Sequence, residues 1–227
     1  MTVQAVVFDM DGLMVDSEPL ALEAWQRSLA PFGARLTDHQ YRCLIGIGHA
    51  DSVRRVLAHT GAPLTYEELD ERFWQHLFAL AETADLRPMP GLLPLLDDLQ
   101  SRGFPLGIAS NSPTEYVHRL MGRIGVAGRF TSLVGADQVQ QPKPAPDVYL
   151  EAARRLGVEP SRCLAFEDSP SGRRAAQAAG MRCVFVPNYE LGMAPAPDAS
   201  AGVYPSLEAC RSALEDILRW ASGPPPS

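Results

Sequence analysis

Polar side chains able to do chemistry stand directly after three short apolar runs of the sequence. They are Asp9 and Asp11 after residues 5–8, Ser110 and Asn111 after residues 105–109, and Glu167 and Asp168 after residues 163–166. Continuous apolar runs ended by a polar residue are typical of strands buried on both faces of a parallel sheet. Because ligands of such sheets bind beyond the carboxyl ends of the strands, we expect four carboxylates and a hydroxyl to gather at one edge.

Such a cluster would need a cation. Carboxylates held close together repel one another, and oxygen ligands select a hard divalent ion such as Mg²⁺. The ion would in turn hold an anionic substrate, most simply a phosphate. Ser110, the backbone amides around Asn111 and the ammonium of Lys143 would complete a phosphate cradle. Asp9 could then attack phosphorus as a nucleophile, while Asp11 could protonate the leaving alcohol and later activate water.

Lys143 stands out against the composition of the chain. It is the single lysine among 20 basic residues, and all the others are arginine. A position that keeps its lysine against this bias favours a role that needs a compact ammonium rather than a planar guanidinium. The alternative is that one lysine codon survived by chance.

Each motif alone also has an ordinary structural explanation. The Asp-x-Asp-Gly sequence occurs in turns and in calcium loops, although an EF-hand loop needs glycine at its sixth position and Gly12 is fourth from Asp9. Residues 167–169 could be a helix N-cap, residues 110–113 a strand-to-helix turn, and Lys143 an exposed loop lysine. The order of the four motifs, each after a strand or in a connecting loop, favours the catalytic interpretation.

The elements that must position these residues alternate between strands and helices. The predicted strands cover residues 5–8, 105–109, 132–134, 163–166 and 183–186. The predicted helices, from their 3.6-residue periodicity, cover residues 92–99, 117–124, 148–156 and 173–179. This alternation predicts an α/β fold, a Rossmann-like parallel sheet with helices on both faces.

The stretch after the first strand breaks this alternation, because it shows amphipathic helical periods and no convincing strand. The helical segments run from Ser17 toward Leu29, from residue 50 to 57 and from residue 66 to 81. We expect an all-helical cap domain over residues 15–86, inserted into a catalytic core of residues 1–14 and 87–227. The end of the chain, residues 223–227, is expected to be disordered.

The overall composition is that of a folded globular chain. The 227 residues are 46% apolar and 21% charged, with a formal net charge of −7. This acidic balance argues against nucleic-acid coating and against binding to anionic membranes. The N-terminus lacks a secretory signal pattern, and the four cysteines read as buried thiols without a Cys-x-x-Cys pair. We expect a cytoplasmic protein whose partner is a small phosphorylated metabolite. The sequence does not determine the oligomeric state, and a monomer is consistent with it.

These motifs together resemble the haloacid dehalogenase superfamily, in its phosphatase and β-phosphoglucomutase-like branch with a helical cap. The matching segments are residues 8–12, 109–111, 143–144 and 167–169 with Gly172. The resemblance covers nearly the whole chain. It implies an aspartyl-phosphate intermediate on Asp9, with Asp11 as the acid and base. It also implies Mg²⁺ held by Asp9, the Asp11 backbone carbonyl and Asp168, with Glu167 as a direct ligand or behind the ligands. Ser110, Asn111 and Lys143 would hold the phosphoryl group.

Departures within the family separate the possible activities. Dehalogenase relatives have a non-acidic residue at the position of Asp11, so this chain is expected to transfer phosphoryl groups. β-Phosphoglucomutase relatives usually carry a histidine and an arginine in the cap where this chain has Ala21 and His49. Losing the arginine weakens binding of a second phosphate. This favours a Mg²⁺-dependent phosphatase of a sugar phosphate or phosphoglycolate-like metabolite; the alternative is a β-phosphoglucomutase-like sugar phosphomutase.

Two expectations concern side chains of the cap. His49 either reaches the substrate and contributes to specificity, or is an exposed loop histidine at a helix start. The aromatic residues Trp25, Phe73, Trp74 and Phe78 have helical spacing and are expected to form cap core rather than to stack on a ligand.

Overall fold

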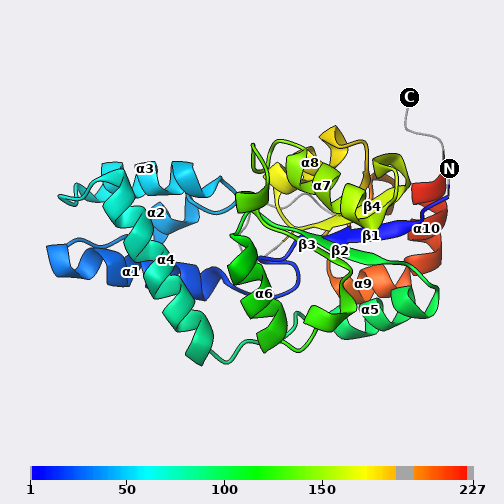
Figure 1. The fold of residues 1–227 in the computed structure, drawn as a ribbon, viewed down its shortest axis with the longest axis horizontal. Helices are drawn as coiled ribbons and strands as arrows, with labels where there is room; N and C mark the ends of the chain where they lie inside the picture. Colours follow the sequence, from blue (N-terminus) through cyan, green and yellow to red (C-terminus); the bar gives the residue numbers. More distant parts are fainter. Residues whose placement is uncertain (1, 188–196, 224–227) are drawn as a thin grey trace. The chain divides into compact units, whose positions relative to one another are not determined.

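The computed structural model describes residues 2–187 and 197–223 (Figure 1). The chain divides into two compact units, Met1–Asp16 with Arg87–Ser227, and Ser17–Leu86. We call the first the core unit and the second the cap unit. Apart from Gly223, the C-terminal end that was expected to be disordered lies outside the described residues.

The core unit is built on a five-stranded parallel sheet. Its strands are β1 (Ala5–Phe8), β2 (Leu106–Ala109), β3 (Ser132–Val134), β4 (Cys163–Glu167) and β5 (Arg182–Phe185), in the order β3-β2-β1-β4-β5. All pairs are parallel, and Val7 in the central strand aligns with Gly107 on one side and Ala165 on the other. Every residue of β1 is buried, as the continuous apolar run predicts.

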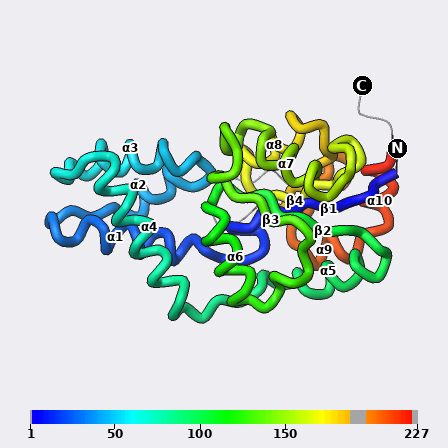
Figure 2. The backbone as a smooth tube through the Cα atoms, in the orientation of Figure 1, coloured from blue at the N-terminus to red at the C-terminus, as the bar shows by residue number. Residues whose placement is uncertain are grey.

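Helices cover both faces of this sheet, which confirms the predicted α/β class. Figures 1 and 2 show α7 (Asp147–Leu156) and α8 (Pro170–Ala178) on one face, with α5 (Leu92–Ser101) and α9 (Leu207–Ser212) on the other. The remaining helices of the core unit are α6 (Thr114–Arg123) and α10 (Leu214–Ser222). Val7 packs in one apolar cluster with residues of α7 and α8, whereas Phe8 faces the opposite side and stacks on Phe166 at 4.9 Å between ring centroids.

The two C-terminal helices, α9 and α10, were not predicted from the sequence. The buried residues of α9 and α10 are Leu207, Cys210, Leu214, Ile217 and Ala221. These residues recur every three or four positions, which is the spacing of an amphipathic helix, so the signal was present in the sequence. The other differences are small: β5 begins one residue earlier than predicted, and α8 begins at Pro170 because Ser169 caps it.

The cap unit is entirely helical. Its helices are α1 (Glu18–Leu29), α2 (Asp38–Arg42), α3 (His49–Thr60) and α4 (Tyr66–Thr83). α2 was not predicted, because five residues are too few to show a helical period. Trp25 of α1 stacks on Phe73 of α4 at 4.0 Å, and both side chains are buried, as expected for cap core.

Short 3₁₀ turns complete the chain. They lie at Ala30–Phe32, Ala127–Arg129, Ala136–Gln138, Pro160–Arg162 and Ala199–Ala201. Among the described residues, no helix combines the length and the apolarity needed to cross a bilayer.

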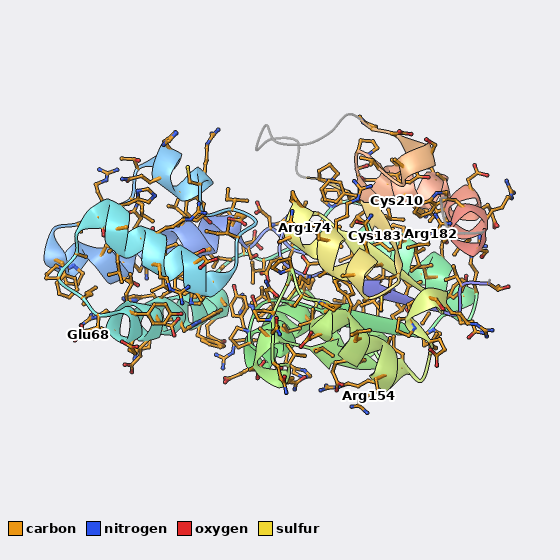
Figure 3. The ribbon with its side chains drawn as sticks, turned by 90° about the horizontal axis from the view of Figure 1, so that it is seen from above. Glu68, Arg154, Arg174, Arg182, Cys183 and Cys210 are labelled. Atoms are coloured by element: carbon orange, nitrogen blue, oxygen red, sulfur yellow. The ribbon has the colours of Figure 1, made fainter. Side chains whose placement is uncertain are left out.

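All four cysteines are free thiols. Cys183 and Cys210, labelled in Figure 3, are buried in the core unit, and so is Cys163. Cys43 is exposed, which corrects the expectation that all four would be buried. It follows α2, the helix that the sequence analysis missed.

Candidate active site

The carboxyl ends of three neighbouring strands bring the predicted residues together in the core unit. Asp9 follows β1, Ser110 follows β2, and Glu167 is the last residue of β4. Because β1 lies between β2 and β4, residues at these three strand ends meet although they are far apart in the sequence. Lys143 reaches the same edge from the loop that precedes α7.

Lys143 joins two of the carboxylates. Its ammonium nitrogen, Nζ, donates to Oδ1 of Asp9 and to Oε1 of Glu167, the latter at 2.6 Å. The side chains of the three residues are 3%, 9% and 0% exposed, respectively. A charge buried this deeply is tolerated only when it is paired and hydrogen-bonded, and each of these groups meets that condition.

Burial and charge set the ionisation of this cluster. Burial and the neighbouring Glu167 raise the pKa of Asp9 to about 7, although Lys143 acts in the opposite direction. Burial also opposes the charge of Lys143, but the carboxylates of Asp9 and Glu167 outweigh it and raise the pKa of Lys143 above its usual value. Lys143 therefore stays charged, and one ammonium faces an excess of carboxylates.

Three carboxylates could share a metal ion. Asp9, Glu167 and Asp168 each offer an oxygen, and these oxygens all lie within 4.8 Å of one another. An all-oxygen donor set with this charge fits a hard cation such as Mg²⁺. Gly12 leaves the space for this group: its φ is +78°, and a Cβ there would lie 2.1 Å from Oδ2 of Asp168.

The side chain of Asp11 lies outside this group of three. Its Oδ2 accepts hydrogen bonds from Oγ of Ser110 at 3.3 Å and from Oγ of Ser112 at 2.8 Å. The two hydroxyls orient the carboxylate, as an acid and base would require. The predicted ligand atom of Asp11 is its backbone carbonyl, and that role stays a prediction.

The side chain of Asn111 is used to hold the lysine loop. Its Nδ2 donates to the carbonyl of Lys143 at 3.2 Å, and the backbone N–H of Lys143 donates to Asn111 Oδ1 at 2.8 Å. An amide side chain can donate and accept at the same time, which suits this paired contact. The predicted contact of Asn111 with a phosphate stays a prediction.

Three contributing residues were missed by the sequence analysis. Ser112 binds Asp11, Tyr149 donates from its hydroxyl to Oε1 of Glu167 at 2.9 Å, and Ser169 binds Oε2 of Glu167. The motif 167–169 pointed to Ser169 only as a helix cap. Tyr149 fits the apolar periodicity of its helix, so the sequence marks it as core and gives no sign of its polar contact.

His49 lies in the cap unit, at the first position of α3. Its Nε2 is 2.5 Å from Oδ1 of Asp70, and its ring contacts those of Trp25, Phe73 and Trp74 with centroids 4.7–5.8 Å apart. Its side chain is 24% exposed, so the expectation of an exposed loop histidine is wrong. Burial lowers the pKa of His49, although Asp70 acts against this shift. A contact of His49 with substrate stays a prediction.

Comparison with known proteins places this arrangement in a family. The chain matches the family described as "Hydrolase: haloacid dehalogenase-like hydrolase" over residues 3–180. It is 33% identical over 187 residues to the fructose-1-phosphate phosphatase YqaB of Escherichia coli, covering 80% of this chain and 95% of that protein.

Solved structures show the same fold. CbbY from Rhodobacter sphaeroides, in complex with phosphate, superposes with a TM-score of 0.81 at 28% identity, over 92% of this chain and 96% of that one. The β-phosphoglucomutase of Clostridium difficile gives a TM-score of 0.79 over 96% and 97% of the two chains; its 24% identity speaks for the fold alone. The chain belongs to the haloacid dehalogenase-like hydrolases. Within that family it is a phosphatase, a phosphoric monoester hydrolase.

Proposed function

We propose that this hydrolase is a Mg²⁺-dependent phosphatase that releases phosphate from a small phosphorylated metabolite through an aspartyl-phosphate on Asp9. The observation that carries the proposal is the double environment of the Asp9 carboxylate. One oxygen bonds the ammonium of Lys143, and the carboxylate also belongs to the acidic group formed with Glu167 and Asp168. A nucleophile between a fixed ammonium and a cation site suits attack on a phosphate, because both positive groups offset the charge of the substrate.

Each residue of the core site has a role in this proposal. Asp9 attacks phosphorus, and Lys143 neutralises the phosphoryl oxygens. Asp11, oriented by Ser110 and Ser112, donates a proton to the leaving alcohol and then takes one from the attacking water. Asp9, Asp168 and the Asp11 backbone carbonyl would hold Mg²⁺. When bound, the ion would neutralise phosphoryl oxygens and orient the substrate.

A sugar phosphate is the favoured substrate class, with a phosphoglycolate-like metabolite next. The support is the similarity to a protein named for fructose 1-phosphate hydrolysis. The state of His49 supports hydrolysis over the mutase alternative. Mutase relatives have an arginine where this chain has His49, and a histidine with a lowered pKa offers no permanent charge to a second phosphate.

Phosphate release tests the proposal. The protein is incubated with p-nitrophenyl phosphate with Mg²⁺ and with EDTA, and then with fructose 1-phosphate, glucose 6-phosphate and 2-phosphoglycolate. We expect Mg²⁺-dependent release and a preference for a sugar phosphate. The Asp9→Asn variant, purified in the same way, controls for contaminating phosphatases.

A second assay separates the phosphatase from the phosphomutase. β-Glucose 1-phosphate is offered, and phosphate release is compared with glucose 6-phosphate formation in a coupled assay on the same sample. We expect hydrolysis with no isomerisation above background. Isomerisation that outruns phosphate release would refute the phosphatase proposal in favour of the mutase.

A further inference from the structure

The carboxylate of Glu167 is enclosed by hydrogen-bond donors. Oε1 accepts from Nζ of Lys143 at 2.6 Å and from the hydroxyl of Tyr149 at 2.9 Å. Oε2 accepts from the backbone N–H groups of Asp168 and Ser169 at 3.1 and 3.0 Å, and from Oγ of Ser169 at 3.1 Å. These five donors fill the roughly four lone-pair sites of a carboxylate, so Glu167 is a fixed anchor. Of its two expected roles at the metal site, this favours a place behind the ligands over direct ligation.

The packing around Glu167 leaves no room for another arrangement. The side chain of Glu167 is 0% exposed, and a Cβ placed on Gly172 would lie 1.7 Å from its Oε1. Tyr149 is also 0% exposed. Solvent therefore cannot replace a donor that is removed from this carboxylate. The loss of one donor must change the hydrogen bonds that the other donors make to Glu167.

Tyr149 touches both partners of the buried Lys143–Glu167 pair. It is the third residue of α7, and its hydroxyl shares Oε1 of Glu167 with the lysine. The ammonium of Lys143 also lies over its ring, with Nζ 5.0 Å from the ring centroid. The two contacts can be separated by experiment, because phenylalanine keeps the ring and removes only the hydroxyl.

The hydroxyl of Tyr149 and the ammonium of Lys143 donate to the same oxygen of Glu167. A neutral donor on Oε1 fixes that oxygen and offsets part of its negative charge. Such a donor would weaken the pull of Glu167 on the ammonium and favour the bond of Lys143 to Asp9. The hydroxyl of Tyr149 is the donor in this contact, because a carboxylate oxygen 2.9 Å away can only accept.

We propose that the hydroxyl of Tyr149 is a positioning group that fixes Oε1 of Glu167 and thereby holds the ammonium of Lys143 on the nucleophile Asp9. Tyr149 acts through these residues and not on the substrate. The kinetic test of this proposal rests on the phosphatase function proposed above. The test that observes the lysine ammonium directly does not depend on that function.

The single lysine of the chain makes a direct test possible. Protein labelled with ¹⁵N at the lysine side chain gives one ammonium resonance, which belongs to Lys143. We expect Tyr149→Phe to shift this resonance or to speed its exchange with water. The matched control is Tyr204→Phe, because Tyr204 is also buried in the core unit. Burial, Cys210 and Asp216 raise the pKa of its hydroxyl. The control should leave the lysine resonance unchanged.

Turnover gives the second readout. At saturating substrate and Mg²⁺, Tyr149→Phe should lower kcat about 10-fold or more, the scale found when groups behind a catalytic residue are removed. In a Glu167→Gln background the same substitution should cost much less, because the acceptor through which the hydroxyl acts has been altered. Additive losses in the two variants would contradict an action through Glu167.

The outcomes separate a positioning role from a merely structural one. If the hydroxyl only stabilises the fold, Tyr149→Phe will have a lower unfolding free energy than the wild type, but the lysine resonance and kcat of the folded variant will be unchanged. That result overturns the proposal. If Tyr149→Phe does not fold, 3-fluorotyrosine at position 149 keeps the hydroxyl and strengthens it as a donor, and an unmoved lysine resonance again refutes the role. A wild-type protein without any turnover would refute the phosphatase proposal, while the lysine resonance still decides the role of Tyr149.

Discussion

Two basic side chains, one in each unit, bind carboxylates, but their pKa values are shifted in opposite directions. Lys143 in the core unit bonds Asp9 and Glu167 with almost no exposure, and its pKa is raised. His49 in the cap unit bonds Asp70, whose side chain is 34% exposed, and the pKa of His49 is lowered. In both cases burial opposes the positive charge; the carboxylates of Asp9 and Glu167 outweigh burial at Lys143, whereas Asp70 does not outweigh it at His49. Ion-pair geometry alone therefore does not establish that a charge is present.

The difference also bears on what each unit can contribute to phosphate chemistry. The core unit keeps a permanent ammonium beside its carboxylates. In the cap unit, His49 lies among aromatic rings and has a lowered pKa, which disfavours a positive charge there. The substitutions below remove or exchange groups on either side of this comparison.

Asp9→Asn is expected to have the largest effect. The amide can still accept a hydrogen bond from Lys143, so the fold should survive, but the nucleophile and a predicted cation ligand are lost together. We expect turnover below detection and a near-normal circular dichroism spectrum. Substantial phosphate release by this variant would show that Asp9 is not the nucleophile.

Asp11→Asn tests a carboxylate of the same site that bonds hydroxyls instead of the lysine. The amide cannot exchange a proton with the leaving group or with water. We expect kcat to fall by about 10²–10⁴-fold, the usual contribution of general acid–base catalysis. A loss of less than tenfold in steady-state kinetics would contradict the acid–base role.

Lys143→Arg keeps the positive charge and changes its shape. A planar guanidinium is larger than the ammonium, and in a site with almost no exposure it must displace Asp9 or Glu167. We expect a loss of about 10²-fold in kcat/KM, the scale of losing one fixed donor at the reacting group.

The control for this exchange is Arg219→Lys, the reverse change at an exposed ion pair with Asp216. It should leave the kinetics unchanged. Wild-type kinetics for Lys143→Arg would mean that the single lysine persisted by chance.

His49→Asn tests the neutral pair of the cap unit and should have the smallest effect. Because the pKa of His49 is lowered on folding, the unfolded chain takes up the proton more readily near pH 6.5. The stability that neutral His49 contributes is complete above this pH and decreases as the pH falls toward the folded value.

Urea unfolding at pH 8 and pH 5 measures this contribution. The wild type should exceed His49→Asn in unfolding free energy by more at pH 8 than at pH 5. A difference that grows on acidification would show instead that a protonated His49 stabilises the pair with Asp70.

Much of the fold and of the core site could be predicted from the sequence. Strands β1, β2 and β4 are short apolar runs, and the residues that end them necessarily share one edge of a parallel sheet. That reasoning alone is enough to bring Asp9, Ser110 and Glu167 together. It needs only the sequence position of each residue relative to its strand.

The remaining contacts depend on how helices and loops pack. The hydroxyl of Tyr149 reaches Glu167 because α7 covers one face of the sheet, and Asn111 grips the lysine loop because two loops meet. Neither meeting leaves a periodic pattern in the sequence. The environment of His49 was missed for the same reason, since it depends on the packing of α1, α3 and α4.

The strand order has a consequence for how the protein is made. Asp9 is synthesised before its partners, because Lys143 follows 134 positions later and Glu167 later still. The central strand β1 therefore has no partner strand when it is synthesised. Its neighbour β2 begins at Leu106 and its other neighbour β4 at Cys163. The helices of the cap unit, residues 17–86, are complete long before that point. During translation the nascent chain thus carries an unpaired, wholly apolar strand on the N-terminal side of a completed helical segment. Of the five strands, β1 has the longest time in which it must be kept from aggregating.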